Sequence, residues 1–463
     1  MSDRYDLVVI GMGSGGIVAV EVATTLGLKT CAVERERVGG DCLWTGCVPS
    51  KALLASAKAA HAMRAAGSYG IAPVEPAVDG AAVWSRIGAV QTRIAEADDN
   101  PERFRALGAE VLFGSARLVG PNDVEVEGHG TLRTRYVLLC TGSRPAVPPV
   151  EGLADAGFQT SETLWDLERP PTSVVAIGGG PIAVELSQAL QRLGTSTTLL
   201  QRGEGILPRD EPELSRLLVE RLRAEGVRLE LGVDAERVTV ENGTKVVHAG
   251  ERSWDGEEIL LGAGRVPNSD GLGLDEVGIE VGPRGVAVDG AYRTSVKSVY
   301  AIGDVAGRHL FTHSAGYEAA RAVRNMFVPG RQRGDFTVPW CTFTDPELAH
   351  VGLTSEQAAA DHGKGKVRTW RLGLDHNDRA RADSADDGVI LIVTAKDRIV
   401  GAHALAPSAG ELIHELALAV HKRLKLSDLA SVVHVYPTLA IGVQQLAAEA
   451  AYERVRRYRW LVR

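Results

Sequence analysis

Apolar runs of strand length alternate with longer helical runs along the first three quarters of the chain. Residues 5–10 are apolar and lead into a glycine-rich turn, residues 17–26 have the alanine-rich composition of a helix, and residues 30–33 are a second apolar run. A strand, a helix and a strand in this order form the βαβ unit of a parallel sheet with helices on both faces. The pattern therefore predicts an α/β fold.

The same pattern recurs further along the chain. An apolar run at 173–177, a glycine-rich turn, a helical run at 182–193 and an apolar run at 195–200 repeat the first unit. The first glycines of the two turns are 167 residues apart (178 − 11). This spacing is too long for a solenoid repeat and indicates two similar Rossmann-like domains.

The last 120 or so residues differ in pattern and follow a linker-like stretch at 328–335. Residues 338–351 and 389–403 are expected to be strands, and residues 410–423 and 439–455 helices. This mixture is typical of an α+β domain. The expected division is 1–149 and 271–337 for an FAD-binding domain in two parts, 150–270 for an NADPH-binding domain, and 338–463 for a dimerisation domain.

Length and charge mainly exclude function classes. A chain of 463 residues predicts about three domains, and 51 basic against 59 acidic side chains give a net charge of −8. No basic surplus favours nucleic acid or an anionic membrane. The amino terminus lacks a secretory pattern, and no apolar stretch reaches the roughly 18 residues of a membrane helix. We therefore expect a cytoplasmic protein without nucleic-acid or membrane partners.

The first glycine-rich turn has the spacing of a dinucleotide-binding motif. Gly11 makes the tight turn, Gly13 lets the backbone approach a pyrophosphate, and Gly16 lets helix and strand pack closely. The helix amino terminus adds partial positive charge. Glu34, 23 residues after Gly11, closes the second strand and can accept hydrogen bonds from a ribose with a free 2′-hydroxyl.

The second glycine-rich turn predicts a different ribose. Gly178, Gly180 and Ala183 occupy the three motif positions, but the residue 23 positions after Gly178 is a glutamine, and Arg202 follows it. Without the carboxylate there is no repulsion against a 2′-phosphate, which a guanidinium can bind bidentately. Arg209, one short loop further on, is a candidate second clamp. The two turns therefore predict one FAD and one NADPH.

A third motif and the cysteines add chemistry. Gly303 and Asp304 follow a strand-like run, a position that also suits a helix cap. Cys42 and Cys47 are five residues apart, about 7.5 Å along a regular helix, whereas a disulfide needs Cα atoms within about 6.8 Å. A bridge would require a distorted first turn, which Gly46 permits. No second pair completes a zinc site, so no metal is expected. Cys31, Cys140 and Cys341 are expected to be small buried hydrophobes.

The block GGDCLWTGCVPSK, residues 39–51, resembles the flavin-dependent pyridine nucleotide–disulfide oxidoreductases, the family of glutathione reductase, dihydrolipoamide dehydrogenase and mercuric reductase. The resemblance extends over nearly the whole chain. It implies that FAD contacts the first glycine turn and Glu34, that Thr141 and Gly142 match a further FAD motif, and that Asp304 after Gly303 holds a ribityl hydroxyl.

The resemblance also implies an electron path from NADPH through FAD to a Cys42–Cys47 disulfide and then to an acceptor. Cys47 would face the flavin, where its thiolate gives a charge-transfer state, and Cys42 would exchange with substrate. Lys51 matches the family lysine near the flavin N5, and Glu185 the carboxylate that pairs with it. The family resemblance implies an obligate homodimer, in which the partner's carboxy-terminal domain completes each active site.

The chain departs from relatives that reduce small disulfides near its end. Their catalytic histidine and its orienting glutamate match Tyr436 and Ile441 here, and only the first histidine of the motif remains, as His434. A tyrosine titrates near 10 and is a poor base at neutral pH, although it can donate a hydrogen bond to a thiolate. His434 would point with Tyr436 only if the segment is extended.

The motif set is closest to the mercuric-reductase-like branch, which has a tyrosine in this region. No cysteine follows Cys341, so we do not expect the carboxy-terminal cysteine pair of those enzymes, nor do we expect their amino-terminal metal module. We expect an NADPH-dependent FAD enzyme whose small-molecule acceptor is a quinone, a metal ion or an unusual thiol compound. The alternatives are a dihydrolipoamide dehydrogenase and, in another class, a flavin-binding redox sensor that does not turn over.

Overall fold

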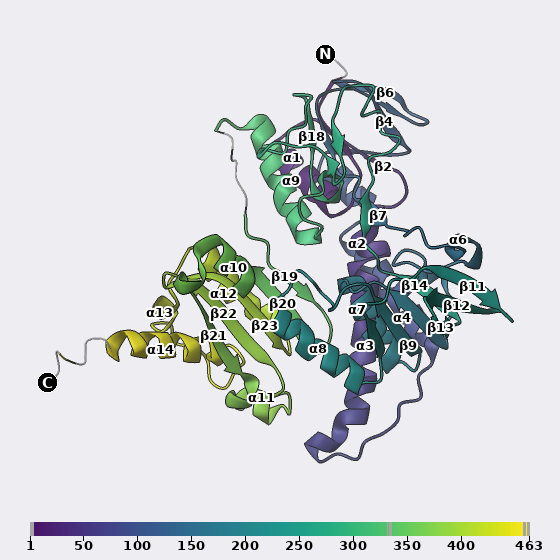
Figure 1. The fold of residues 1–463 in the computed structure, drawn as a ribbon. Coiled ribbons are helices and arrows are strands. Elements are labelled where there is room, and N and C mark those ends of the chain that lie inside the picture. The colour runs from purple at the N-terminus through teal and green to yellow at the C-terminus, as the bar shows by residue number, and fades with distance from the viewer. Residues whose placement is uncertain (1–3, 331, 333–335, 457–459, 461–463) are drawn as a thin grey trace.

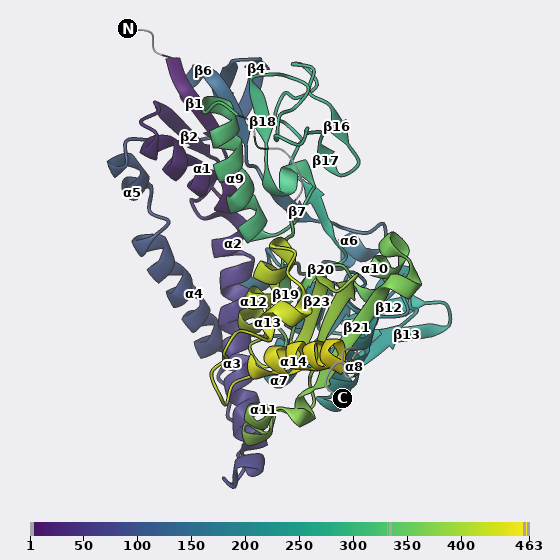
Figure 2. The same ribbon diagram turned by 90° about the vertical axis from the view of Figure 1, so that its left-hand side faces the viewer.

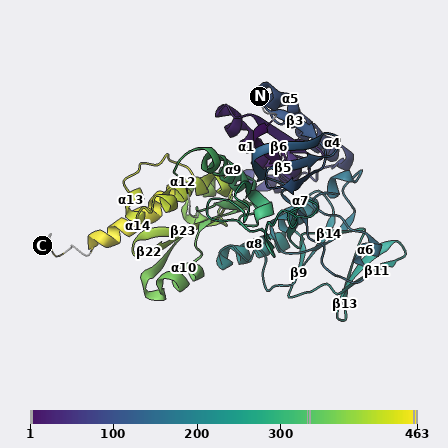
Figure 3. The same ribbon diagram turned by 90° about the horizontal axis from the view of Figure 1, so that it is seen from above.

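The computed structural model forms three lobes, each built on its own β-sheet (Figure 1). It describes residues 4–330, 332, 336–456 and 460, so the expected linker at 328–335 lies partly outside the described residues. Seen from above, the carboxy-terminal lobe extends to one side of the other two (Figure 3). The observed architecture confirms the expected α/β fold with a separate carboxy-terminal domain.

The first lobe contains a seven-stranded sheet. Its strands in spatial order are β3 (Glu110–Phe113), β2 (Thr30–Glu34), β1 (Arg4–Ile10), β6 (Gly130–Leu139), β5 (Asp123–Val126) and β4 (Ala116–Gly120), with β18 (Val299–Ala301) also paired to β6. The strands β3, β2, β1, β6 and β18 pair in parallel. Helices α1 (Ser14–Thr25) and α9 (Thr312–Phe327) pack side by side against the sheet (Figure 2). Two distant segments of the chain therefore build one lobe.

The second lobe repeats the βαβ pattern, as the sequence predicted. Its sheet is parallel, in the order β10 (Arg228–Leu231), β9 (Ser196–Gln201), β8 (Ser173–Ile177) and β14 (Glu258–Leu261). Its helices are α7 (Pro181–Arg192) and α8 (Pro212–Ala224). The sequence analysis missed an antiparallel sheet of β11 (Arg237–Glu241), β12 (Thr244–Ala249) and β13 (Arg252–Gly256).

A long helix joins the first two lobes. Helix α3 (Cys47–Ala65) begins below the first lobe and runs past the second to the far tip of the molecule, with α4 (Gly80–Ala97) beside it (Figures 1 and 2). The short helix α2 (Gly40–Trp44) precedes and contacts α3. The remaining short elements of the first two lobes are α5 (Pro101–Ala106), α6 (Leu153–Ala156), β7 (Ser143–Pro145), which pairs with β15 (Arg265–Pro267), and β16 (Val281–Gly282), which pairs with β17 (Gly285–Val286).

The third lobe is an antiparallel five-stranded sheet covered by helices. The strands run β19 (Trp340–Thr342), β20 (Glu347–Gly352), β23 (Arg398–Ala406), β22 (Val389–Ala395) and β21 (Val367–Gly373), and the helices are α10 (Ser355–His362), α11 (Asp378–Ala382), α12 (Ala409–His421), α13 (Leu426–Leu429) and α14 (Ile441–Arg456).

Both expected strands of this lobe were wrong in extent, because each is a pair of strands. In the second pair, Lys396 and Asp397 have φ angles of 50° and 67°, which make the tight turn of a hairpin. In the first pair, Pro346 interrupts the run, since it has no backbone N–H to donate to a ladder. The expected domain boundaries stay a prediction.

Candidate functional site

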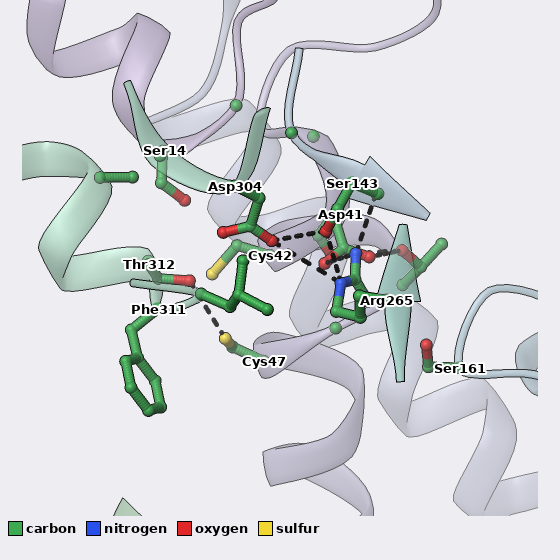
Figure 4. Close-up of a pocket in the computed structure, with 18 of the residues that line it drawn as sticks. Ser14, Asp41, Cys42, Cys47, Ser143, Ser161, Arg265, Asp304, Phe311 and Thr312 are labelled. Atoms are coloured by element: carbon green, nitrogen blue, oxygen red, sulfur yellow. Dashed lines mark hydrogen bonds and ion pairs between the residues drawn. The ribbon is translucent and has the colours of Figure 1, made fainter. Parts of the chain in front are cut away.

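A pocket of about 1650 Å³ lies where the three lobes meet. The carboxyl ends of β1 and β2, the amino ends of α1 and α3, and the start of α7 contribute to its walls, together with β19 from the third lobe. In parallel α/β sheets, ligands bind outside the carboxyl ends of the strands. Figure 4 is a close-up of the part of this pocket around Cys42, Cys47 and Asp304.

The first glycine turn has the geometry of a dinucleotide cradle. Gly11 has φ +96°, and a Cβ there would lie 2.6 Å from the carbonyl oxygen of Cys140. A Cβ at Gly16 would lie 1.9 Å from the carbonyl oxygen of Gly11, so helix and strand touch there. A Cβ added to Gly13 would have only the Cα of Gly40 nearby, at 3.8 Å. The backbone of Gly13 is therefore open to the pocket.

One acid and a further turn line the same pocket. The Glu34 carboxylate is held at the end of β2 by the backbone N–H groups of Met12 at 2.7 Å and Glu36 at 2.8 Å. The Thr141 hydroxyl donates to a backbone carbonyl at 2.7 Å, and Gly142 has φ +70°. Glu34, Thr141 and Gly142 all line the pocket.

Asp304 belongs to a cluster that the sequence analysis missed. Ser143 Oγ donates to Asp304 Oδ2 at 2.5 Å, and Arg265 donates to Ser143 Oγ at 2.7 Å and forms an ion pair with Asp41 at 3.0 Å (Figure 4). Burial raises the pKa of Asp304, against the Ser143 hydrogen bond and the Arg265 charge. Arg265 and Asp41 are 224 residues apart, so no local pattern signals their contact.

The glycine cradle, the acid at the end of β2 and the Asp304 cluster fit FAD. The backbone at Gly13 is open to a pyrophosphate, and Glu34 is an acceptor for a ribose hydroxyl. Asp304, with its partner Ser143, is an acceptor for a further hydroxyl.

The two redox cysteines lie on different helices. Cys42 is in α2, which ends at Trp44, and Cys47 is the first residue of α3. The helix is interrupted at Thr45 and Gly46, a larger departure from regular geometry than a distorted first turn, and this break brings the cysteines together. Both are free thiols, and the Cys42 thiol hydrogen-bonds to Cys47.

Hydroxyl groups and a lysine surround the two sulfurs. Cys47 Sγ lies 3.4 Å from Thr312 Oγ1, at the start of α9 (Figure 4). The hydrogen bond from Cys42 lowers the pKa of Cys47 to about 6, opposed by burial and helped by Thr312 and the charge of Lys51. The same thiol pair, with burial, raises the pKa of Cys42 well above its usual range. Cys47 is therefore the thiolate at neutral pH.

Lys51 and Glu185 form the expected ion pair. Lys51 Nζ lies 2.8 Å from Glu185 Oε2, and the other carboxylate oxygen accepts the backbone N–H of Phe343 at 2.8 Å. The ammonium also lies 4.5 Å from the centre of the Phe343 ring. Burial lowers the pKa of Lys51, but the Glu185 carboxylate outweighs it and the pKa is raised. Lys51 is one helical turn from Cys47 and keeps its charge in the pocket.

The second glycine turn is similar, but its two arginines lie differently. Gly178 has φ +124°, and a Cβ added to it would lie 2.4 Å from the carbonyl oxygen of Gly262. A Cβ added to Gly262 would in turn lie 2.7 Å from the Cβ of Ala183. Arg202 is exposed just after β9 and is not among the residues that line the pocket. Arg209 lines the pocket, with its guanidinium 4.8 Å from the centre of the Trp340 ring. The open face of Gly180 also lines the pocket.

The segment that replaces the histidine–glutamate dyad lies on the third lobe, before α14. Tyr436 is 65% exposed, and its hydroxyl donates to Asp378 Oδ2 at 2.9 Å, which raises its pKa. His434 is occupied at both ring nitrogens: Nε2 lies 2.9 Å from a Glu415 oxygen, and Nδ1 lies 3.1 Å from the Val432 carbonyl oxygen. Neither side chain lines the pocket of its own chain.

The remaining cysteines are not all core residues. Cys31 and Cys140 are buried, as expected. Cys341 is only half-buried and lines the pocket close to Lys51, so it is not simply a core residue. Burial and the neighbouring carboxylates, Glu347 first, raise its pKa, so it is protonated at neutral pH.

Neither a membrane-spanning helix nor a metal-ligand cluster occurs in residues 4–330, 332, 336–456 and 460. No helix there is long and apolar enough to cross a membrane. No group of three or more histidine, cysteine or acidic side chains there could hold a metal ion.

The chain matches a family model described as pyridine nucleotide-disulphide oxidoreductase over residues 5–323, and the dimerisation domain of the same family over residues 338–447. It is 34% identical to a dihydrolipoyl dehydrogenase of Thermus scotoductus over 97% of this chain and 98% of that protein. It is 33% identical to a mercuric reductase of Bacillus cereus over 95% of this chain and 70% of that protein.

A solved structure has the same fold. The HOCl-induced flavoprotein disulfide reductase RclA from Escherichia coli superposes with a TM-score of 0.85 at 24% identity, over 96% of this chain and 99% of that one. The resemblance inferred from the cysteine block is thus confirmed. The chain belongs to the pyridine nucleotide–disulphide oxidoreductase family, whose members are FAD-containing oxidoreductases.

Proposed function

We propose that this homodimeric enzyme passes electrons from NADPH through FAD to the Cys42–Cys47 pair, and on to an acceptor that is not a standard small disulfide. One observation carries the proposal: the two thiols and the Lys51–Glu185 ion pair lie in one pocket, beside two dinucleotide-type glycine turns. Bound FAD would supply two-electron chemistry between a nicotinamide and a disulfide.

The chain's own groups prepare this chemistry. Lys51, held by Glu185, keeps a cation in the pocket, where it stabilises negative charge. Cys47 is a thiolate at neutral pH because Cys42 and Thr312 hydrogen-bond to it. Cys42 is held protonated, so it would have to lose its proton before it exchanges with the acceptor.

The preference for NADPH rests on Arg202, with Arg209 as a second candidate. Arg202 stands next to the position at which NADH-binding relatives of this motif carry an acid, and it is exposed to an incoming nucleotide. A guanidinium favours a 2′-phosphate through charge-assisted hydrogen bonds. The nucleotide's pyrophosphate would approach the open backbone at Gly180.

The acceptor follows from the missing base. Exchange with a small disulfide needs a thiolate and a proton donor for the leaving sulfur. Tyr436 has a raised pKa, and both nitrogens of His434 are engaged. Among the described side chains of this segment, no free histidine is available, which favours a quinone, a metal ion or an unusual thiol compound.

A homodimer would bring this segment to the partner's pocket. The family's dimerisation domain supports the dimer, as do the exposed apolar side chains around the segment, with Val433 91% and Val435 76% exposed. An odd, sparse set of five cysteines is not a structural disulfide framework, which suits the reducing cytoplasm, where we infer that the enzyme works.

A second candidate function is dihydrolipoamide dehydrogenase. The 34% identity to a dihydrolipoyl dehydrogenase over 98% of that protein favours it. A redox sensor that is reduced without turnover is the candidate from another class.

A turnover screen with purified enzyme separates the three. NADPH oxidation is followed with a benzoquinone, Hg²⁺, lipoamide and glutathione disulfide, using the unmodified enzyme, Cys42→Ser and Cys47→Ser. The proposal expects turnover with a non-disulfide acceptor that both variants lose. Lipoamide as the best acceptor would favour the dehydrogenase. Reduction by NADPH without turnover on any acceptor would favour the sensor, and full turnover in both variants would exclude the cysteine route.

A further inference from the structure

Helix α9 carries a buried acid that the chemistry above does not use. Glu318 has no exposed surface, and most of its neighbours on the inner face of α9 are small apolar residues, such as Ala315, Ala319 and Ala322. Its Oε1 atom is buried without a hydrogen-bond partner in the described chain. Burying a carboxylate is costly unless it makes compensating contacts, so its one strong contact identifies its role.

That contact is with the turn that carries Asp304. Glu318 Oε2 accepts the backbone N–H of Gly303 at 2.8 Å. Gly303 has φ +68° and begins a short 3₁₀ turn, Gly303–Ala306, which ends at Gly307. At the start of such a turn the N–H group has no partner within the turn, and Glu318 supplies one from the adjacent helix.

The position of Gly303 brings its N–H group close to helix α9 and to Glu318. A Cβ there would lie 3.0 Å from the Cβ of Ala315, so helix α9 packs directly against the turn. The next residue, Asp304, points the other way, into the pocket, where Ser143 and Arg265 hold its carboxylate (Figure 4). Glu318 therefore holds the turn from the core side and Ser143 from the pocket side.

The groups around Glu318 act on its charge in both directions. Burial raises the pKa of Glu318 to about 7, and the Gly303 N–H and the charge of Arg308 oppose that rise. The charge of Asp304 also raises the pKa of Glu318, and the charge of Arg321 lowers it. A neutral side chain at this position would avoid the cost of burial but would bind the Gly303 N–H less strongly.

We propose that Glu318 is a positioning residue of the FAD site, which fixes the Gly303–Asp304 turn so that the Asp304 carboxylate faces the cofactor. This rests on the proposed function only in that the enzyme binds FAD. Glu318 acts through Asp304 and does not itself contact the cofactor.

The test measures FAD affinity rather than turnover. Apoprotein is titrated with FAD, and quenching of flavin fluorescence gives the Kd for the unmodified chain, Glu318→Ala and Glu318→Gln. A hydrogen bond to a charged group is worth enough that its loss should raise the Kd about tenfold or more. Glu318→Gln keeps an acceptor oxygen and should lie between the other two.

Asn325→Ala is the matched control on the same helix. Asn325 is also buried, and its side chain donates to the Gln332 carbonyl oxygen at 3.0 Å and accepts the Gln332 N–H at 2.8 Å. This change should lower the melting temperature of the apoprotein but leave the Kd for FAD unchanged. An equal loss of affinity in Asn325→Ala and Glu318→Ala would show a general packing effect and overturn the proposal.

A double-mutant cycle with Asp304→Asn tests whether Glu318 acts through Asp304. If it does, Glu318→Ala should weaken FAD binding much less in the Asp304→Asn background than alone. Independent, multiplicative effects would overturn the proposal, as would a Kd within twofold of the unmodified value for Glu318→Ala. If Glu318→Ala does not fold, the same cycle with Glu318→Gln decides. Failure of the unmodified apoprotein to bind FAD would instead contradict the proposed function.

Discussion

The chemistry of the cysteine pair depends on which thiol gives up its proton. Cys47 accepts hydrogen bonds from Cys42 and Thr312 and lies within the field of Lys51, whereas Cys42 is the donor of the pair. Two identical side chains five residues apart therefore have opposite properties. The sequence identified the pair, but the two hydroxyls that assist it, from Ser14 and Thr312, became visible only in the structure.

We expect the thiolate of Cys47 to form above a pH of about 6 and to be lost as pH falls through that value. Replacing Thr312 by valine removes one donor, so the transition should move up by about one pH unit. The pH dependence of iodoacetamide labelling, mapped to Cys47 by mass spectrometry, measures it. Thr92→Val, on the exposed face of α4, is the control. An unchanged profile in Thr312→Val would show that the hydroxyl is not a donor to the thiolate.

A second residue-scale prediction concerns the nucleotide. Arg202→Gln should remove contacts to the 2′-phosphate that are worth about 1–3 kcal/mol. The value of kcat/KM for NADPH should therefore fall by about 5- to 150-fold, whereas that for NADH should stay almost unchanged. Arg209→Gln, measured alongside, shows whether the arginine stacked on Trp340 reads the same phosphate. Equal use of both nucleotides by the unmodified enzyme would refute the assignment of NADPH.

At the scale of elements, the regular pattern was predictable and the irregular parts were not. The strand, glycine turn and helix of each dinucleotide unit lie within a few residues of their predicted positions, because one short segment encodes each of them. The break between α2 and α3 depends on non-helical backbone at Gly46, and the Asp304 cluster on contacts across more than 100 residues. No periodicity encodes contacts of that kind.

The segment before α14 gives the element-scale prediction. Tyr436→His and Ile441→Glu together should restore part of the turnover with lipoamide, since a histidine with an orienting glutamate can move a proton near neutral pH. Either change alone should restore little. Steady-state rates of the three variants measure it. Full recovery by one single change would show that the second position plays no part.

At the scale of the whole molecule, the proposed function needs a second copy of the chain. The three lobes enclose the pocket with Cys42 and Cys47, but neither Tyr436, which is exposed on the third lobe, nor the largely buried His434 lines it. A second copy of the chain would supply them, and two-fold symmetry would complete both sites at once.

Val433→Asp should therefore weaken the dimer. A valine that is exposed in one chain and buried between two contributes about 1.5–3 kcal/mol, so the dissociation constant should rise at least tenfold for each copy. Sedimentation at several protein concentrations measures it, with Val240→Asp, an exposed position on β11, as the control. An unchanged dimer in Val433→Asp would place the interface elsewhere.

The central claim is that electrons leave through Cys42 and Cys47 to an acceptor other than a small disulfide. The most direct test is the turnover of the unmodified dimer with lipoamide and glutathione disulfide, next to a benzoquinone, at neutral pH. General acid–base help is worth about 10²–10⁴-fold, so lipoamide turnover should fall below that of the Thermus scotoductus dihydrolipoyl dehydrogenase by roughly that factor. Turnover with the benzoquinone should depend much less on the missing acid–base group than turnover with lipoamide. Lipoamide rates equal to those of that relative would contradict the account.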